Sequence, residues 1–294
     1  MQQQNTQALN SHIAKLKKAG YSQDNEVEWR ETMTVSKRTV CTWVLIFLVT
    51  SPAALAAAEL YTALGDSLAF GALAPPLRGY AYLYRNHIAT DTGATVFLYD
   101  LGVPGWTSND LRGALKGNFL FRVLVAKSKV VTWDIGGNDL RAARNSYKGG
   151  TCGGPDNQDC LKVAVATFKI NWNAIMGAIL SLRSSSNTIV RTMDIYNPFV
   201  VVDSHSDSWP DDGLNDFQAL KPYLDEVNSY IAATADAAGI PHASVYKAFN
   251  GSGGDEDPIA KGYIAFDSFH PNATGHAVIA NLLRLLGYSP LYPR

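Results

Sequence analysis

The stretch Leu60-Tyr61-Thr62-Ala63-Leu64-Gly65-Asp66-Ser67-Leu68-Ala69-Phe70-Gly71 decides the fold. A short apolar run ends in Gly-Asp-Ser and then passes into small and apolar residues. This pattern predicts a buried strand, a tight turn and the start of a helix. Ser67 would then lie at the carboxyl end of a strand, where open α/β sheets place their sites. Alternatively, Ser67 only caps that helix.

The rest of the chain continues this alternation of short strands and longer helices. Apolar runs predict strands at 95–100, 130–135, 188–193 and 242–245. Apolar residues three and four positions apart predict helices at 80–92, 161–182, 214–238 and 273–286. Strands that are apolar throughout need cover on both faces of their sheet. The sequence therefore predicts one α/β domain over 59–294, a three-layer α/β/α sandwich with a central, mainly parallel five-stranded sheet.

The first 58 residues are typical of a targeting segment. Residues 1–32 form a polar N-terminal extension, and Met33 offers a second start, so whether they are translated stays open. From Met33 onward, a basic pair, an apolar run at 40–49 and an Ala-rich end predict a signal peptide over 33–58. The alternative is a membrane anchor at 40–58, and no later stretch is predicted to span a membrane. We expect a secreted or extracytoplasmic protein.

Charge and cysteine content narrow the chemistry. The chain of 294 residues has a formal net charge of -1, which gives no reason to expect nucleic acid as a partner. Cys152 and Cys160 bracket a polar loop and predict a disulfide in an exported protein rather than a metal site. His205 lies among aspartates at 203–212, which suggests either a cation site or, more commonly, a flexible acidic loop. We expect neither a metal nor an organic cofactor.

Three further stretches follow strands or precede the final helix in chemically suggestive ways. The glycines at 101–111 allow a turn whose backbone N–H groups face a ligand, or an ordinary loop. Asn138 in 135–139 presents an amide at the rim of the sheet, or simply forms a turn. Asp267 and His270 are three residues apart, so a carboxylate can orient an imidazole, although this pair is common by chance.

Taken in order, these stretches resemble the four signature blocks of the SGNH hydrolase superfamily, the GDSL-type lipases and esterases. The blocks are Gly65-Asp66-Ser67-Leu68, Gly105 within Val103-Pro104-Gly105, Gly136-Gly137-Asn138-Asp139 and Asp267-Ser268-Phe269-His270-Pro271. The resemblance extends over 59–286. It implies a flavodoxin-like fold.

The resemblance also implies a role for each matching residue. Ser67 would be the nucleophile, His270 its general base, and Asp267 the acid that orients His270. The oxyanion hole would comprise the backbone N–H groups of Ser67 and Gly105 and the side chain of Asn138. Gly102 is a competitor for the place of Gly105. Asp66 is expected to form the turn, and His276 is expected to be structural.

From these features we expect a secreted serine ester hydrolase that cleaves carboxylic esters through an acyl-serine intermediate. Alternatives on the same scaffold are a carbohydrate acetylesterase, a (lyso)phospholipase, a thioesterase and a noncatalytic binding module. The partner would be a small-molecule or lipid ester, without nucleic acid or a stable membrane partner, and the protein would be a monomer. Five residues either wall an acyl pocket or merely pack: Phe70, Leu73, Pro75, Pro76 and Trp106.

Overall fold

A single parallel sheet organises the protein in the computed structural model, which describes residues 58–292. The strands are β1 (Glu59–Gly65), β2 (Val96–Gly102), β3 (Val130–Trp133), β4 (Ile189–Met193) and β5 (His242–Ala243). Their order is β2-β1-β3-β4-β5, and every neighbouring pair is parallel. This order is the flavodoxin-like one. The predicted fold class, a three-layer sandwich with a five-stranded sheet, is thus confirmed.

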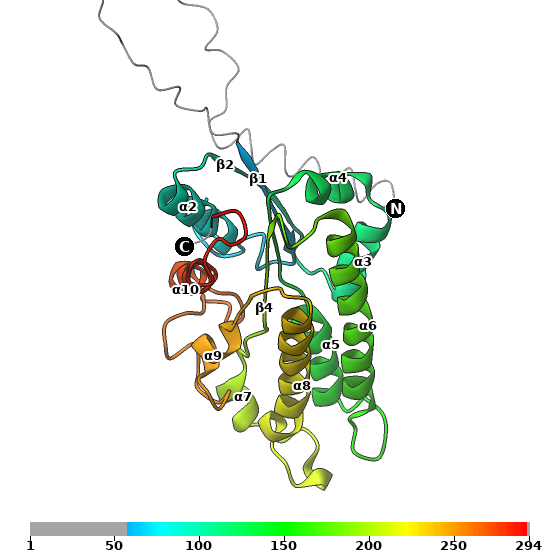
Figure 1. Ribbon diagram of the computed structural model, residues 1–294. Helices are drawn as coiled ribbons and strands as arrows, with labels where there is room; N and C mark the ends of the chain where they lie inside the picture. Colours follow the sequence, from blue (N-terminus) through cyan, green and yellow to red (C-terminus); the bar gives the residue numbers. More distant parts are fainter. Residues whose placement is uncertain (1–57, 293–294) are drawn as a thin grey trace, which may run out of the picture. The chain divides into compact units, whose positions relative to one another are not determined.

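Helices cover both faces of the sheet, as a buried parallel sheet requires. Figure 1 shows α2 and α10 on one side of the strands and α3, α6 and α8 on the other. The helices are α2 (Tyr80–Thr92), α3 (Ser108–Gly117), α4 (Phe119–Lys127), α5 (Gly137–Lys148), α6 (Asp159–Leu182), α7 (Val200–Ser204), η1 (Pro210–Asp212, a short 3₁₀ turn), α8 (Asp216–Ala237), α9 (Val245–Asn250) and α10 (Ala273–Leu285). All of these elements lie in one compact unit.

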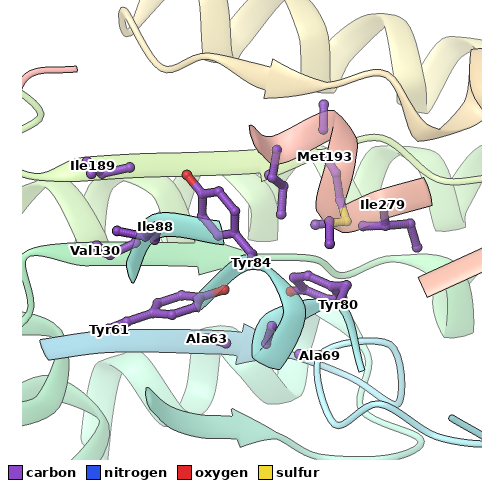
Figure 2. Close-up of a cluster of buried hydrophobic side chains, with 14 of the residues drawn as sticks. Tyr61, Ala63, Ala69, Tyr80, Tyr84, Ile88, Val130, Ile189, Met193 and Ile279 are labelled. Carbon is purple, nitrogen blue, oxygen red and sulfur yellow. The ribbon is translucent and has the colours of Figure 1, made fainter. Parts of the chain in front are cut away.

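The first core lies between the sheet and helices α2, α9 and α10. Tyr61 and Ala63 of β1 point into it, together with Tyr84 of α2 and Ile279 of α10 (Figure 2). The rings of Tyr61 and Tyr84 meet edge to face with centroids 5.9 Å apart. Alternate residues of β1 therefore pack on this face of the sheet, and Leu64 packs on the opposite face.

The second core lies under α3, α4, α6 and α8. Helix α6 contributes a continuous apolar stripe that includes Val165, Phe168, Trp172 and Ile175. Contrary to the prediction that no later stretch could span a membrane, α6 has the length and composition to do so, with a mean hydropathy of 1.4. Its buried stripe packs on the sheet, which is the arrangement of a core helix in this fold.

The predicted helix immediately after Ser67 is wrong. Residues 66–79 form consecutive turns, and helix α2 begins only at Tyr80. Gly71 has φ +73°, and Leu73 and Leu77 have φ near +60°, values that a right-handed helix excludes. Prolines at positions 75 and 76 add a further obstacle to helix formation.

The parallel register brings three loops to one edge of the sheet. Gly65 at the end of β1 pairs with Gly102 of β2, and Leu64 pairs with Trp133 of β3. The residues that follow these strands are therefore neighbours in space. The predicted extension 1–32 and signal peptide 33–58 lie outside the described residues, apart from residue 58, and they stay predictions.

Candidate active site

Ser67 is held by a tight turn directly after β1. Gly65 has φ +148°, and a Cβ atom there would lie 2.5 Å from the carbonyl oxygen of Asp134. Only glycine therefore lets β1 approach β3 so closely. The Asp66 carboxylate accepts the backbone N–H of Leu68 at 2.9 Å, so Asp66 forms the turn as predicted. Ser67 itself is mostly buried.

His270 and Asp267 meet Ser67 from a loop before α10. Nε2 of His270 lies 2.9 Å from Oγ of Ser67, and Nδ1 of His270 lies 2.5 Å from Oδ2 of Asp267. The other Asp267 oxygen accepts the backbone N–H groups of Phe269 and His270 at 3.1 and 3.0 Å. The structure thus brings together three residues that the sequence separates by as many as 203 positions.

The charge of Asp267 is stabilised by this loop. Partial burial raises the pKa of its carboxyl group, but hydrogen bonds from His270 and from the backbone outweigh burial and hold the pKa below its usual value. Asp267 is therefore an anion at neutral pH. An anion at Nδ1 keeps the proton on that nitrogen and leaves Nε2 as the acceptor that faces Ser67.

The three groups predicted for the oxyanion hole are the backbone N–H groups of Ser67 and Gly105 and the side-chain amide of Asn138. Among the described residues, no acceptor bonds to the N–H of Ser67 or of Gly105. Gly105 has φ +85° and open space where a Cβ would stand. Gly102 differs, because its N–H donates to Asp100 at 3.0 Å and a Cβ there would lie 2.3 Å from the Phe70 nitrogen. Geometry favours Gly105 over Gly102 as a donor.

Asn138 lies at the start of α5, and its side chain is buried. Its Nδ2 donates to the carbonyl of Trp106 at 2.8 Å and, more weakly, to Asp66 Oδ2 at 3.3 Å. Its Oδ1 accepts from Arg141 at 3.2 Å. Because a guanidinium only donates, the Arg141 contact fixes the amide with its nitrogen toward Trp106 and Asp66.

Residues 63–278 match the model of the GDSL-like lipase/acylhydrolase family. The chain belongs to that family. The match contains all four signature blocks, so the predicted membership of the SGNH hydrolases is confirmed. The family suggests that this protein is a hydrolase that cleaves esters.

Solved structures of similar fold include several GDSL-type and related hydrolases. A lipase from goat rumen metagenome has a TM-score of 0.65 and 22% identity, covering 80% of this chain and 100% of that one. An acetyl-xylooligosaccharide esterase of Geobacillus has a TM-score of 0.53 and 16% identity (80% and 97% covered). Phospholipase A1 of Streptomyces albidoflavus has a TM-score of 0.51 and 18% identity, covering 78% of this chain and 99% of that one. No curated protein sequence matches.

Sequence reasoning missed a buried acid in this GDSL hydrolase, Asp134. Asp134 follows β3. Its Oδ1 accepts a hydrogen bond from the Tyr80 phenol at 2.6 Å, and its Oδ2 lies 3.5 Å from the backbone nitrogen of Asp66. Burial and the neighbouring carboxylate raise the pKa of Asp134 well above its usual value, and burial raises the pKa of Asp66 to about 6. The one available signal was a carboxylate at the end of an otherwise apolar strand.

Asp139 was also missed, although it follows Asn138 directly. It accepts the backbone N–H of Ser108 at 2.8 Å and the Ser108 hydroxyl at 2.5 Å. Asn171 of α6 donates to the same hydroxyl at 2.9 Å. Burial raises the pKa of Asp139 despite these donors. These contacts tie the loop that carries Gly105 to the helix that carries Asn138.

The remaining predicted residues are placed as follows. The Cys152–Cys160 disulfide is present, as predicted. The acidic stretch is not a uniformly exposed loop, because Asp203 is buried and ion-paired with Arg144. Within residues 58–292, no group of three or more acidic, His or Cys side chains is arranged for a metal ion.

His276 of α10 connects two parts of the fold, in keeping with the structural role expected for it. Its Nδ1 accepts the backbone N–H of Tyr80 at 3.2 Å, and its Nε2 lies 3.3 Å from the carbonyl of Ala72. Burial lowers the pKa of His276 to about 4, so the imidazole is neutral at physiological pH. It thereby fixes the turns after Ser67 against α10.

Proposed function

We propose that this protein is a secreted serine hydrolase that cleaves carboxylic esters through an acyl-serine intermediate. One observation carries the proposal: the unbroken chain from Ser67 Oγ to His270 Nε2 at 2.9 Å and from His270 Nδ1 to Asp267 Oδ2 at 2.5 Å. A serine hydroxyl becomes a competent nucleophile when a positioned base removes its proton. The family match supports the same reaction class.

In the proposed first half-reaction, Ser67 Oγ attacks the ester carbonyl and its proton passes to His270 Nε2. The carbonyl π electrons move to the oxygen, and Asp267 stabilises the imidazolium. When the tetrahedral intermediate collapses, the C–O bond to the alcohol breaks and His270 gives its proton to the departing oxygen. In the second half, water attacks the acyl-serine with His270 as base, which releases the carboxylic acid and restores Ser67.

The negative oxygen of the intermediate would lie against the N–H groups of Ser67 and Gly105. We infer that Asn138 Nδ2 joins them by exchanging its long 3.3 Å contact with Asp66 for the oxyanion, while it keeps the 2.8 Å bond to Trp106. Burial raises the pKa of Asp66 to about 6, so this carboxyl group beside the oxyanion is mainly neutral only below about pH 6.

Export is proposed on two grounds. The segment 33–58 has the composition of a signal peptide. The Cys152–Cys160 disulfide is typical of proteins that fold in an oxidising compartment. Mass spectrometry of protein recovered from the culture medium tests this point, with a mature N-terminus just before Glu59 as the expected result. Retention in the membrane fraction with residues 40–58 still attached would contradict it.

The activity itself is tested with p-nitrophenyl acetate and butyrate. We expect hydrolysis by the wild type and a loss of about 10⁴-fold or more in kcat for Ser67→Ala and for His270→Ala. Ser252→Ala, at an exposed serine in the 250–258 loop, is the matched control and should retain wild-type activity. Full activity of Ser67→Ala would contradict the proposed mechanism.

A further inference from the structure

A cavity of about 110 Å³ opens directly beside Ser67 and His270. It extends along one face of α5, where Gly137, Leu140 and Arg144 line it. These residues are three, four and seven positions apart, which places them on one side of a helix. Gly137 lies near Asp66 and therefore near the nucleophile. From Gly137 to Arg144 the cavity follows α5 for about 10 Å at 1.5 Å per residue.

The other walls of this cavity are mainly apolar. Helix α8 contributes Leu220, Tyr223 and Leu224, and the segment between β4 and α7 contributes Ile195 and Phe199. None of the five residues suggested by sequence for an acyl pocket lines it. Trp106, for example, stacks on Phe121 with ring centroids 5.5 Å apart and belongs to the second core.

An ion pair between Arg144 and Asp203 forms part of the cavity wall. Arg144 donates to both carboxylate oxygens of Asp203, at 2.8 and 2.5 Å, and its guanidinium lies 4.0 Å from the ring centre of Phe199. Lys148 also bonds Asp203, at 3.3 Å, and forms a second ion pair with Asp216. Because Asp203 belongs to α7, these contacts clamp α7 onto α5. The lining of the cavity thus includes both the nucleophile and this charged, paired wall.

We propose that this cavity holds the acyl chain of the substrate and that the Arg144–Asp203 pair limits the length of that chain. The inference rests on the proposed function and specifies its substrate class: esters of straight, medium-length fatty acids, with the alcohol left outside. A mainly apolar cavity beside Ser67 favours methylene groups, each of which adds up to about fourfold to kcat/KM while it enters. A chain longer than the cavity meets a charged, paired wall and gains nothing further.

The test compares p-nitrophenyl acetate, butyrate, octanoate and palmitate. For the wild type we expect kcat/KM to rise from acetate to octanoate and to fall for palmitate. Leu140→Trp fills the cavity and should lower the octanoate-to-acetate ratio of kcat/KM at least about tenfold. Leu224→Trp, from the opposite wall, should do the same if the first variant folds poorly. The ratio is taken within each variant, so loss of folded protein cancels.

Leu73→Trp is the matched control, because Leu73 is an exposed member of the pocket that the sequence suggested. Its ratio should equal that of the wild type. The clamp is tested with Arg144→Ala/Asp203→Ala, which removes both charges and leaves neither unpaired. This double variant should raise the palmitate-to-octanoate ratio several-fold.

Three results would overturn the inference in distinguishable ways. Hydrolysis of acetate with an octanoate-to-acetate ratio that Leu140→Trp and Leu224→Trp leave unchanged would overturn the acyl cavity and leave the proposed function intact. A ratio that changes in Leu73→Trp instead would move the acyl chain to the turns after Ser67. No turnover of any ester by the wild type would overturn both the proposed function and this inference.

Discussion

The phenol of Tyr80 donates a 2.6 Å hydrogen bond to Oδ1 of Asp134, and both side chains are buried. The bond joins the first residue of α2 to the residue after β3, next to the Gly-Asp-Ser turn. A buried carboxyl group without a donor is costly, so this single phenol matters for the stability of the edge of the sheet that carries Ser67.

Tyr80→Phe should therefore lower the free energy of unfolding by about 1–3 kcal/mol, because it leaves Oδ1 of Asp134 without its donor. Tyr84→Phe is a matched control four residues along the same helix. Its buried hydroxyl has no hydrogen-bond partner among the described residues, so removing it should change stability little. Urea unfolding of the three proteins measures both effects. Equal losses for the two variants would show that the hydrogen bond is unimportant.

The Asp66–Asp134 pair also predicts a pH dependence of stability. Burial raises the pKa of both carboxyl groups, that of Asp66 to about 6, so the folded state holds protons that the unfolded chain releases near pH 4. This pair's contribution to stability therefore falls as pH rises from about 4 through about 6. Two further groups act on the pKa of Asp66: the nearby His270 lowers it, and the nearby Asp139 raises it.

Asp134→Asn should weaken this dependence, because it removes one of the two acids while an amide oxygen still accepts from Tyr80. Relative to the wild type, the variant should become more stable as pH rises from 4 to 7. The stability of Asp66→Asn relative to the wild type should also increase over this pH range. Urea unfolding at several pH values measures the difference, and parallel pH curves for the wild type and both variants would refute the prediction.

The sequence predicted the sheet and the site blocks because their signals are local. The apolar run before Gly65 ends where the strand ends, and Asp267 and His270 are close in the chain. The resemblance then assigned partners to Ser67 that lie far away in sequence.

The cavity could not be predicted in the same way. Helix α5 is polar and carries arginines, and the apolar lining of the cavity depends on α8 and on the segment before α7, which approach α5 only in the folded chain. Asp134 is similar, since its one signal in the sequence, a carboxylate at the end of an apolar strand, does not distinguish a buried carboxyl group from a loop residue. Leu73 and its neighbours look like a pocket wall in sequence, but none of them lines the cavity.

Loss of the Asn138 amide should reduce turnover more than it reduces substrate affinity. Asn138→Ala removes a proposed oxyanion donor, so kcat should fall about 10²–10³-fold with a smaller change in KM. Asn145→Ala, at an exposed position on the same helix, should leave kcat unchanged. Steady-state kinetics on p-nitrophenyl butyrate measures both. A change confined to KM would show that Asn138 binds substrate and does not stabilise the transition state.

Gly105 and Gly113 differ in backbone conformation, although both have room for a Cβ atom. A Cβ atom would meet nothing within 4 Å at either position, but Gly105 has φ +85° and Gly113 lies within α3. Gly105→Ala should cost about 1–2 kcal/mol of stability and lower kcat, because the strained peptide shifts its N–H. Gly113→Ala should add about 0.5–1 kcal/mol and leave kcat unchanged. Thermal unfolding and steady-state kinetics measure the stability and kcat of both variants. A stable, fully active Gly105→Ala would show that Gly105 is not an oxyanion donor.

Covalent labelling with a fluorophosphonate, followed by peptide mass spectrometry, tests directly whether Ser67 is the nucleophile. We expect one adduct, on the peptide that contains Ser67, which is absent in Ser67→Ala and forms much more slowly in His270→Ala because the base is missing. An adduct on another residue, or equal labelling of Ser67→Ala, would contradict the role proposed for Ser67.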